Sequence, residues 1–461
     1  MSHERNMHPH HGPVPSVTSY SATDGSKTLI WGFAIIILAG AILLKLPVAS
    51  AMERPLTWQE ALFTSTSATT VTGLVVLNTA NDLSVFGQVV VLLLIQVGGV
   101  GFMVLSVVLF RLIGRRVGLG ERLLLRQVLG VKQSQGLVHL TLVAAIVVVG
   151  IELIGAIILF FTWLDIMPPR QAAYFAIFHS ISAFCNAGFD LFQGTTDPIL
   201  VATRQDPLAV FALSVLIIIG TLGIVVIFDV LTYFKVRQLS LHSRLIIPLT
   251  IILTVLGTAL LLADEAIFGH ALSDMSPLER WLTALFTVVS SRTAGITFVP
   301  IQDLGQASQL TLMIFMFIGS APASMGGGVG LTTVAVVLIT LYTNVRGYPD
   351  VRIFERTIPT ETLHKAVAII TVSTVLVAGV TMFELLAGKK DLFATGFEVV
   401  SAFSNTGYSL GITSQLNVVS RILIVLTMFW GRLGPLTLVV ALAQRRYKTQ
   451  IRYPREHIII G

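Results

Sequence analysis

The sequence predicts an all-α polytopic membrane protein in which four covalently linked helix, pore-helix, filter-loop, helix repeats surround one central pore. Three observations predict this fold. Apolar residues make up 54% of the 461-residue chain and charged residues only 12%, too few to cover a soluble protein of this length. Long apolar runs alternate with shorter ones, and four related glycine-containing strings recur at nearly constant spacing. Together they argue against a soluble enzyme, a disordered chain and a nucleic-acid-binding protein.

The first 27 residues are polar and contain no apolar run of the kind that a cleaved signal peptide needs. We expect residues 1–27 to form a disordered cytoplasmic tail. Its histidines could bind a transition metal, but the tail offers no fixed scaffold, so we predict no physiological metal site there. Cys185 is the only cysteine in the chain, which excludes an intrachain disulfide.

Eight apolar runs follow that are long enough to cross the hydrocarbon core of a bilayer, which takes about 20 helical residues. They cover residues 28–48, 84–112, 138–163, 207–234, 243–268, 308–343, 361–385 and 418–443. Within each successive pair lies a shorter apolar stretch of about 12 residues, too short to span the membrane. We interpret these four stretches as re-entrant half-helices, because irregular backbone at membrane depth must be surrounded by protein or line a water-filled cavity.

The loops after the half-helices carry the strongest repeat signal. Their glycines are 115, 107 and 112 residues apart, at Gly73, Gly188, Gly295 and Gly407. They end the strings ALFTSTSATTVTG, AIFHSISAFCNAG, ALFTVVSSRTAG and TGFEVVSAFSNTG, in each of which a Phe precedes a Ser by four residues. Four such matches indicate fourfold internal repetition. We assign the repeats to residues 28–115, 116–237, 238–346 and 347–445, followed by a cytoplasmic tail over 446–461.

Lysine and arginine are distributed unevenly between the two sides of the predicted membrane domain. The segments that join one repeat to the next, with the C-terminal tail, hold 18 of the 30 Lys and Arg residues. The segments on the other side hold seven Lys and Arg residues and 14 of the 24 Asp and Glu residues. By the positive-inside rule, both termini of this multi-pass cell-membrane protein are cytoplasmic and the half-helices enter from outside.

Four half-helices that end in glycine-containing loops at membrane depth have the geometry of an ion-selectivity filter. The C-terminal end of each half-helix carries partial negative charge, so four ends aimed at one cavity favour a cation there. Glycine permits positive φ and lets main-chain carbonyls replace the hydration shell of the ion. The predicted ion ligands, mostly main-chain oxygens, come from Thr70, Val71, Thr72, Gly73, Cys185, Asn186, Ala187, Gly188, Thr293, Ala294, Gly295, Asn405, Thr406 and Gly407.

Small residues also gather where membrane helices pack tightly, so helix packing is the alternative interpretation of any single loop. The fourfold repetition and the preceding half-helices favour the filter. Arg292 would repel cations if it faced the ion path, so we expect its side chain to point away and support the filter from behind. Cys185 is expected to be structural and to contribute its main-chain oxygen.

The apolar run over 308–343 is interrupted by a segment with five glycines and a proline. Glycine costs about 1 kcal/mol and proline about 3 kcal/mol in a helix interior, so the helix should break there. Just below the filter, the resulting loop would obstruct conduction until it moved aside; a simple packed kink is the alternative. The candidate gate residues are Gly319, Ser320, Ala321, Pro322, Ala323, Ser324, Met325, Gly326, Gly327 and Gly328.

Arg432 is an intramembrane charge in the last apolar run. A buried guanidinium costs at least about 2.5 kcal/mol, so Arg432 should face the bundle interior and donate to carbonyls or an acid. We favour a role in gating or in bracing the filter over a purely structural bridge. Glu152 and Glu384 are expected to be structural partners rather than ion ligands. Asp190 either concentrates cations at the outer mouth or is a solvated loop residue.

These motifs resemble the Trk/Ktr/HKT superfamily of potassium transporters, and in particular the membrane subunits of bacterial Ktr systems. The resemblance covers residues 28–461 and rests on the filter strings and on QVGGVGFM, GTLGIVVIFDV, MFWGRLGPLT and IRYP. It implies a potassium-channel-like pore, a membrane homodimer, and regulation by a cytosolic ring of nucleotide-binding RCK subunits. It also implies that 319–330 is the intramembrane gate loop, in contact with Arg432. Gly330 departs from the family pattern, which has lysine there, so the details of gate closure stay open.

The sequence therefore favours potassium uptake down its electrochemical gradient, with the potassium ion as substrate and no covalently bound cofactor. Sodium dependence stays open, and the alternative is a sodium-permeable or sodium–potassium coupled transporter of the same superfamily. An enzyme would need clustered catalytic groups at membrane depth, and His179, alone in its half-helix, is expected to be a packing residue. A receptor or scaffold would not explain four half-helices entering from one side.

The chain carries no nucleotide-binding fingerprint, so nucleotide is expected on the partner subunit only. The basic segments 111–134, 342–366 and 443–461 are the expected docking face for that partner, or else they contact anionic membrane lipid. No nucleic-acid partner is expected.

Overall fold

The structure is a computed structural model that describes residues 22–101, 137–194, 196–269, 271–348, 350–388 and 391–434. Most of the predicted N-terminal tail, the whole tail 446–461 and the basic segment 111–134 lie outside these residues. The described chain is helical, as predicted, except for one antiparallel hairpin of β1 (Arg352–Ile353) and β2 (Arg356–Thr357). Three single 3₁₀ turns complete it, η1 (Pro47–Ala49), η2 (Ile301–Asp303) and η3 (Thr413–Gln415).

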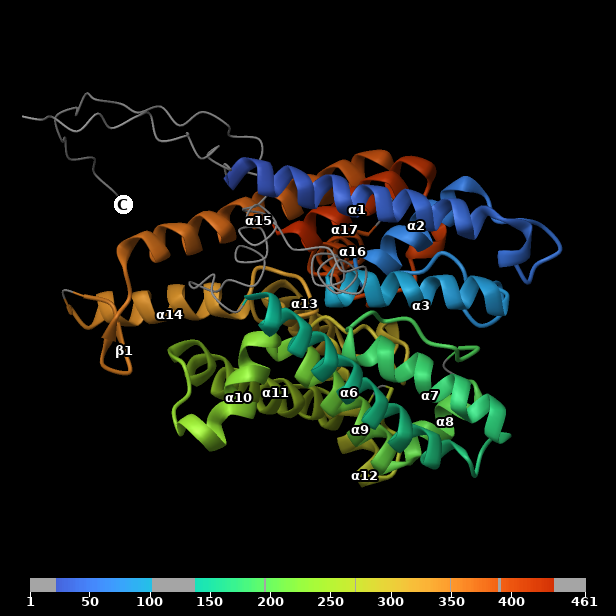
Figure 1. Cartoon of the computed structure of the whole chain (residues 1–461), viewed down its shortest axis with the longest axis horizontal. Helices are drawn as coiled ribbons and strands as arrows, with labels where there is room; N and C mark the ends of the chain where they lie inside the picture. Colours follow the sequence, from blue (N-terminus) through green and yellow to red (C-terminus); the bar gives the residue numbers. More distant parts are fainter. Residues whose placement is uncertain are drawn as a thin grey trace, which may run out of the picture.

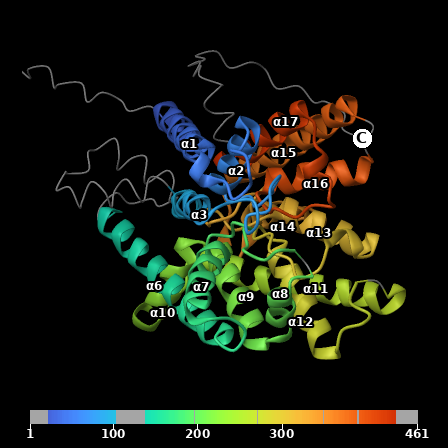
Figure 2. The ribbon, with the colours of Figure 1, turned by 90° about the vertical axis from the view of Figure 1, so that its right-hand side faces the viewer.

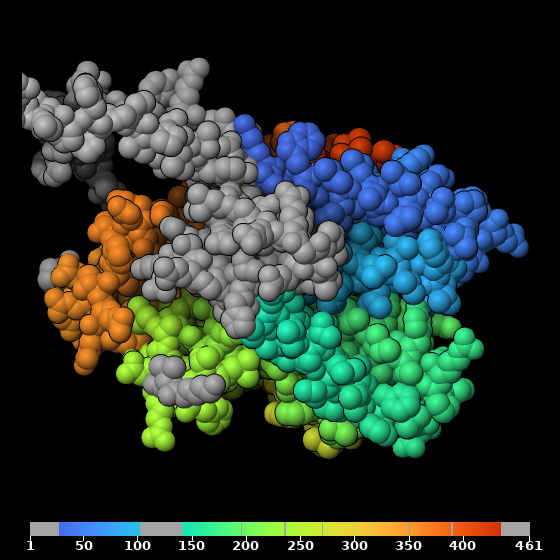
Figure 3. All heavy atoms as spheres, in the orientation of Figure 1, coloured from blue at the N-terminus to red at the C-terminus, as the bar shows by residue number. Residues whose placement is uncertain are grey.

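The first helix of each repeat is long and unbroken. These helices are α1 (Ala22–Lys45), α6 (Leu137–Trp163), α11 (Leu241–Phe268) and α15 (Thr360–Ala387). Among the described helices, they are the ones that are individually long and apolar enough to cross a membrane. Large apolar side chains such as Ile35 of α1 and Phe161 of α6 are exposed, as side chains that face lipid would be. In Figure 3 the blue atoms of the first repeat and the teal atoms of the second lie on the surface of the molecule.

The pore helices are the four half-helices that the sequence predicts. They are α2 (Trp58–Thr69), α7 (Pro169–Phe184), α12 (Pro277–Ser290) and α16 (Leu392–Ser404). Local signals fix where they start: Thr57 and Glu60 form a capping box on α2, and Pro occupies the first position of α7 and α12. The repeated phenylalanine of each pore helix is at most 1% exposed and packs in the core.

The second helix of each repeat has only 13 to 16 residues, too few to cross a membrane, although the sequence predicts a break only in the third repeat. These helices are α3 (Val85–Val100), α9 (Pro207–Leu222), α13 (Gln306–Ile318) and α17 (Val418–Leu433). The expected single run over 207–234 is therefore wrong, because Gly223, with φ of 83°, separates α9 from α10 (Ile224–Val236). In the third repeat α14 (Leu331–Val345) follows the expected break. Gly101 and Gly434 end α3 and α17 with similar positive φ.

A short helix, α8 (Pro198–Gln205), precedes α9 and was not expected. Asp197 and Asp206 each cap the helix that follows, and each stands before a proline in the first helical position. Because two helices start only nine residues apart in the sequence, the chain turns between them, and α8 and α9 meet at an angle of 88°.

The four repeats surround a common centre (Figure 2). Within a repeat, the long first helix packs along the pore helix of the same repeat. Each second helix also contacts the pore helix of the next repeat, in the pairs α3 with α7, α9 with α12, α13 with α16, and α17 with α2. The hairpin and the end of α14 lie at one end of the molecule, and α8 lies towards the other (Figure 1). The pore helices point inward to the centre, where their C-terminal loops meet.

Candidate ion filter and gate

The filter loops at the ends of the four pore helices share one main-chain hydrogen bond. The oxygen of the repeated serine accepts from the N–H of the residue before the filter glycine, at 2.8, 2.8, 2.8 and 3.0 Å. The pairs are Ser67 with Thr72, Ser182 with Ala187, Ser290 with Ala294, and Ser401 with Thr406. The third loop makes the same bond although it is one residue shorter. The four loops therefore have related backbone folds despite their different side chains.

Two positions in each filter loop have positive φ. The filter glycines have φ values from 70° to 93°. Two residues earlier, φ is 51° at Val71, 56° at Asn186, 121° at Thr293 and 54° at Asn405. A β-branched residue such as Val71 or Thr293 avoids positive φ, and such strain persists only where the surrounding structure imposes it. The packing of the pore helices thus holds the filter backbone in a conformation that the free chain would avoid.

The four filter glycines form a closed ring. A Cβ atom at each of them would lie within 3.0 Å of a main-chain oxygen of the next loop. In chain order these oxygens belong to Ala187, Ala294, Thr406 and, from Gly407 back to the first repeat, Thr72. Only glycine fits where four main chains converge this closely. The structure brings the four predicted filter loops together, and main-chain oxygens are groups of the kind that can replace water around a dehydrated cation.

Side chains hold the ends of the filter loops. Ser182 Oγ and Ser290 Oγ donate to the main-chain oxygen of the residue after the filter glycine, at 2.5 and 2.7 Å. Ser401 Oγ instead accepts from the N–H of Gly407 at 3.1 Å. The repeated serine that the sequence singles out therefore has a positioning role in these three loops.

Asn405 ties the last loop to the first. Its Nδ2 donates to Thr72 Oγ1 at 2.8 Å and to the main-chain oxygen of Met428 in α17 at 2.9 Å. Tyr408 OH, just after the same loop, donates to the main-chain oxygen of Thr287 in α12 at 3.0 Å. The ring is thus fastened by side chains as well as by backbone contact.

A buried polar cluster lies behind the second filter loop. Glu152 of α6 accepts from Gln96 Nε2 of α3 at 3.0 Å, and Cys185 Sγ lies 3.7 Å from Glu152 Oε1. Glu152 is 6% exposed. It acts as a structural partner, as expected, and links two helices to the side chain of a filter residue. Gln96 is the first residue of the QVGGVGFM motif, and nothing in the sequence predicts that it belongs to the site.

Two further side chains, those of Arg292 and His179, are held in position by packing and hydrogen bonds. Arg292 is 3% exposed, and its Nη2 donates to Thr250 Oγ1 of α11 at 3.5 Å, behind the third loop. His179 Nδ1 hydrogen-bonds to the main-chain oxygen of Phe175 at 2.8 Å, and its Nε2 accepts from Leu191 N at 3.2 Å. These two bonds fix a neutral tautomer, so His179 is the packing residue that the sequence predicts. It also anchors the chain that follows the second filter loop.

The candidate gate, residues 319–330, is an irregular loop between α13 and α14. Ala321 N and Met325 N donate to the main-chain oxygens of Thr221 and Gly220 at the end of α9, at 3.1 and 3.2 Å. These bonds hold the loop against the end of α9, where the helix of the second repeat is broken. The loop thus uses the unpaired carbonyl groups of one broken helix to satisfy its own amides.

The gate loop also lies against the filter. A Cβ atom at Gly326 would collide with Thr293 Oγ1, and one at Gly327 would collide with Asn405 Oδ1. No side chain fits at these two positions while the loop stays where it is. The loop therefore lies directly against residues of the third and fourth filter loops.

Arg432 connects the gate loop to the first repeat. Its guanidinium donates to the main-chain oxygens of Met325 in the loop and of Gly98 in α3, and it donates to Gly99 O at 3.1 Å. The side chain therefore faces the bundle interior and donates to carbonyls, as predicted from the cost of burying it. Two of its three acceptors lie in the last turn of α3, and the third lies in the irregular gate loop.

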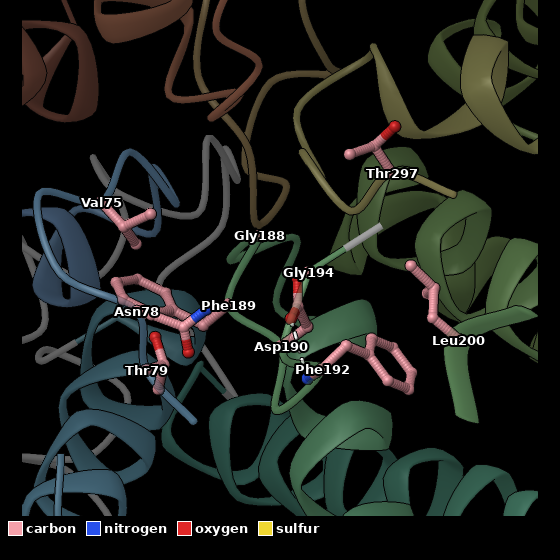
Figure 4. A pocket seen from close by; sticks show the side chains of 10 residues that line it. All are labelled: Val75, Asn78, Thr79, Gly188, Phe189, Asp190, Phe192, Gly194, Leu200 and Thr297. Carbon is pink, nitrogen blue, oxygen red and sulfur yellow. Dashed lines mark hydrogen bonds between the residues drawn. The ribbon is translucent and has the colours of Figure 1, made fainter. Parts of the chain in front are cut away.

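A mouth pocket of about 210 Å³ opens at the other end of the filter. Val75, Gly188 and Thr297, from three different repeats, line it together with Asp190 (Figure 4). Asp190 lies in the loop between α7 and α8, outside the spanning helices, and its Oδ1 accepts from Phe192 N at 3.0 Å. Burial, with a smaller contribution from the nearby charge of Asp197, raises the pKa of Asp190 to about 7, although the hydrogen bond from Phe192 N lowers it.

A second set of glycines determines how closely the second helix of a repeat approaches the pore helix of the same repeat. These glycines were not predicted to be part of the site. A Cβ atom at Gly98, Gly220 or Gly431 would collide with the main-chain oxygen of Thr69, Phe184 or Phe403, each at the C-terminal end of a pore helix. The signal for them was present: each begins a G-x-x-G motif, in GGVG, GTLG and GRLG, and each motif ends where its helix breaks.

Comparisons with known proteins agree with this architecture. The model of the TrkH family, described as cation transport protein, matches residues 18–449. Ktr system potassium uptake protein B of Bacillus subtilis (strain 168) is 33% identical over 94% of this chain and 96% of its own. Potassium/sodium uptake protein NtpJ of Enterococcus hirae is 32% identical over 93% and 96%. The crystal structure of the potassium transporter TrkH from Vibrio parahaemolyticus has the same fold, with a TM-score of 0.72 at 19% identity, covering 92% of this chain and 86% of that one.

Proposed function

Because the chain belongs to the TrkH family of cation transport proteins, we propose that it takes up potassium across the cytoplasmic membrane through its four filter loops. The observation that carries the proposal is the closed ring in which each filter glycine faces a main-chain oxygen of the next loop. Neutral carbonyl oxygens around one axis suit a dehydrated monovalent cation. The relatives that are named as potassium uptake proteins support potassium as that cation.

A sodium-permeable or sodium–potassium coupled transporter is the second candidate function. It is favoured by the 32% identity to a relative named as a potassium/sodium uptake protein. Main-chain oxygens serve either ion, so the discrimination depends on how rigidly the loops hold their spacing.

In the proposed mechanism the loop 319–330 is the gate. The position of the loop against Thr293 and Asn405 supports this role, because an ion that leaves the filter there would meet the loop. Conduction then requires the loop to break its hydrogen bonds to α9 and to release the guanidinium of Arg432. Transport is passive, driven by the electrochemical gradient.

The proposal places both termini in the cytoplasm and the mouth pocket outside. The described part of the basic segment 342–366, which includes Arg346, Arg352 and Arg356, lies at the end of the molecule that would face the cytoplasm. There it would meet anionic lipid or the cytosolic RCK ring that the family resemblance implies. That resemblance also implies a homodimer, and nucleotide control through the ring.

The test is isotope flux into proteoliposomes with potassium, rubidium and sodium in competition. The wild-type protein is expected to take up ⁸⁶Rb⁺, with potassium competing more strongly than sodium. Gly295→Ser should weaken this preference, because a side chain at Gly295 collides with Thr406 O in the filter ring. Gly396→Ser is the matched control, since Gly396 lies on the pore helix α16 with no atom within 4 Å of its Cβ position.

The outcomes separate the two candidate functions. Strong competition by potassium alone supports potassium uptake, and equal competition by sodium supports the second candidate. Uptake that depends on the presence of both ions indicates coupling. If Gly295→Ser keeps the selectivity of Gly396→Ser, the assignment of the filter is wrong.

A further inference from the structure

We propose that the side chains of Asn186 and Asn405 are positioning residues that couple the filter to the gate. Each amide links one filter loop to the helix end that holds the gate loop. The inference rests on the proposed pore function and adds to it a physical connection through which ion selectivity depends on the position of the gate.

Asparagine occupies the same position in the second and fourth filter loops, two residues before the filter glycine. The φ angle is 56° at Asn186 and 54° at Asn405, a left-handed conformation that asparagine adopts more readily than most residues. Val71 and Thr293 stand at this position in the other two loops. Because the loops follow one another in chain order around the ring, the two asparagines lie on opposite sides of it.

The amide of Asn405 links the fourth loop to α17. Its Nδ2 donates to the main-chain oxygen of Met428 at 2.9 Å. Met428 stands three residues before Gly431, the glycine that packs against the end of the pore helix α16. It also stands four residues before Arg432. The fourth loop is therefore attached about one helical turn from the guanidinium that donates to the gate loop.

The amide of Asn186 makes the equivalent link to α9. In the orientation that pairs both of its ends, Nδ2 donates to Ile217 O at 3.3 Å, and Oδ1 accepts from Thr221 N at 3.2 Å. Ile217 stands three residues before Gly220, which is the position of Met428 relative to its own packing glycine. The two amides thus reach equivalent carbonyl groups in the second and fourth repeats.

The same two helix ends hold the gate loop. At the end of α9, two main-chain oxygens accept from Ala321 N and Met325 N at 3.1 and 3.2 Å. At the end of α17, Arg432 donates to Met325 O. Gly327 of the loop lies so close to Asn405 Oδ1 that a Cβ atom there would collide with it. Displacement of the loop changes the contacts of both helix ends, and the two amides transmit this change to opposite sides of the filter.

Within the described residues, the other two filter loops make no such link. Val71 has an apolar side chain, and Thr293 Oγ1 has no hydrogen-bond partner there. Both asparagines are 0% exposed, so their amides cannot exchange these bonds for bonds to bulk water. A filter discriminates between ions through the number and spacing of its carbonyl groups. Loss of the amides should therefore reduce the discrimination between potassium and sodium.

Asn186→Gly and Asn405→Gly test the links, because glycine keeps the left-handed backbone and removes only the side chain. The measurement is ⁸⁶Rb⁺ uptake into proteoliposomes with potassium and sodium as competitors. Each variant should lower the preference for potassium over sodium by about three- to tenfold, as for the loss of one or two neutral hydrogen bonds. Asn186→Gly is the cleaner variant, because Asn405 also donates to Thr72 Oγ1.

Gln309→Ala is the matched control. Gln309 is a buried residue of α13, and its Nε2 donates to the main-chain oxygen of Leu304 at 2.8 Å, outside the filter loops. The substitution removes a buried amide that donates to main-chain oxygen, as the asparagine substitutions do. All three variants should unfold at a lower temperature than the wild type, but Gln309→Ala should keep the preference for potassium.

A double-mutant cycle tests the connection to the gate. Arg432→Gln releases the loop and should raise the half-saturating concentration of Rb⁺ by about fivefold or more in the wild-type background. In the Asn405→Gly background the same substitution should change this concentration by a factor close to one, because the link that transmits the change is missing. In the Gln309→Ala background the full factor should remain.

A second pair of variants serves if the asparagine variants do not fold. Thr221→Val removes a hydroxyl that lies 3.3 Å from the amide of Asn186, and it should lower the preference for potassium by about twofold. Thr427→Val is its control. Thr427 is also buried, and its hydroxyl donates to Leu423 O of its own helix at 2.8 Å.

The outcomes distinguish this inference from the proposed function. Asparagine variants with the ion preference of Gln309→Ala, or Thr221→Val with that of Thr427→Val, would overturn the positioning role and leave the pore intact. An equal effect of Arg432→Gln in both backgrounds, or no effect in either, would overturn the connection to the gate. Absence of Rb⁺ uptake by the wild-type protein would instead overturn the proposed function.

Discussion

Arg432 and Met325 are 107 residues apart in the sequence, and the guanidinium of the first donates to the main-chain oxygen of the second. The same guanidinium donates to Gly99 O at 3.1 Å, so one side chain joins the gate loop to the end of α3. The hydrogen bond from α17 to the gate loop thus belongs to a single residue that can be changed.

Arg432→Gln should raise ion flux in the absence of any partner subunit. A hydrogen bond from a charged donor contributes about 1.5–3 kcal/mol, so losing the bond to Met325 O should shift the loop towards its displaced state by about ten- to hundredfold. The measurement is basal ⁸⁶Rb⁺ uptake into proteoliposomes. Arg421→Gln is the control, because Arg421 lies in the same helix and donates to Ser414 O at the surface. Equal uptake by the two variants would count against a role for Arg432 in holding the gate.

Gly220→Ala should destabilise the protein by about 1–3 kcal/mol or more. The new methyl group would collide with Phe184 O and force α9 away from the pore helix α7, which is overpacking of a tight contact. Thermal unfolding in detergent, followed by size-exclusion chromatography, measures the change. Gly379→Ala is the matched control within α15, where no atom lies within 4 Å, and alanine there should stabilise the helix slightly. If both variants unfold at the same temperature, Gly220 is not needed for the close contact between α9 and α7.

Potassium affinity should fall as the pH drops through about 7. The pKa of Asp190 is raised to about 7 by burial, so its carboxylate is charged above that pH and neutral below it. A negative charge in the mouth pocket concentrates cations, so the half-saturating potassium concentration should rise on the acid side. Asp190→Asn should show the raised value at all pH values. A wild-type curve that does not change between pH 6 and 8 would exclude this role.

The same shift has the opposite consequence for stability. The folded-state pKa of Asp190 lies above its ordinary value of 3.8, so the folded protein binds the proton more tightly than the unfolded chain does. Stability should therefore decline as the pH rises from about 4 to about 7, and Asp190→Asn should remove this decline. Thermal unfolding across that pH range, with the wild type beside the variant, measures it.

The fold could be predicted largely because its signals are local and repeated. The helix expected over 361–385 is α15, Thr360–Ala387, and the four half-helices end where the glycine strings placed them. The break at Gly223 was missed because one glycine in a long apolar run lowers helix propensity by only about 1 kcal/mol. Its cause is tertiary: Gly220 must approach Phe184 O, and the gate loop takes the carbonyl groups that the break exposes.

The sequence predicted which residues belong to the site, but not which of them contact one another. The cost of burying Arg432 predicted its inward direction and its carbonyl acceptors, but nothing local identifies Met325 and Gly98 as those acceptors. The bond between Asn405 and Thr72 joins residues 333 positions apart. Such pairs follow from the order in which the repeats close around the centre, which only the folded chain defines.

The closing contact between Gly407 and Thr72 O also constrains how the molecule is made. The first filter loop is synthesised early, yet its neighbour on one side belongs to the last quarter of the chain. Contacts between such distant segments form late, after the intervening chain has been inserted and folded. A chain released before α16 is complete therefore has three loops and no closed ring. A closed ring therefore forms only after nearly the whole polypeptide has been made.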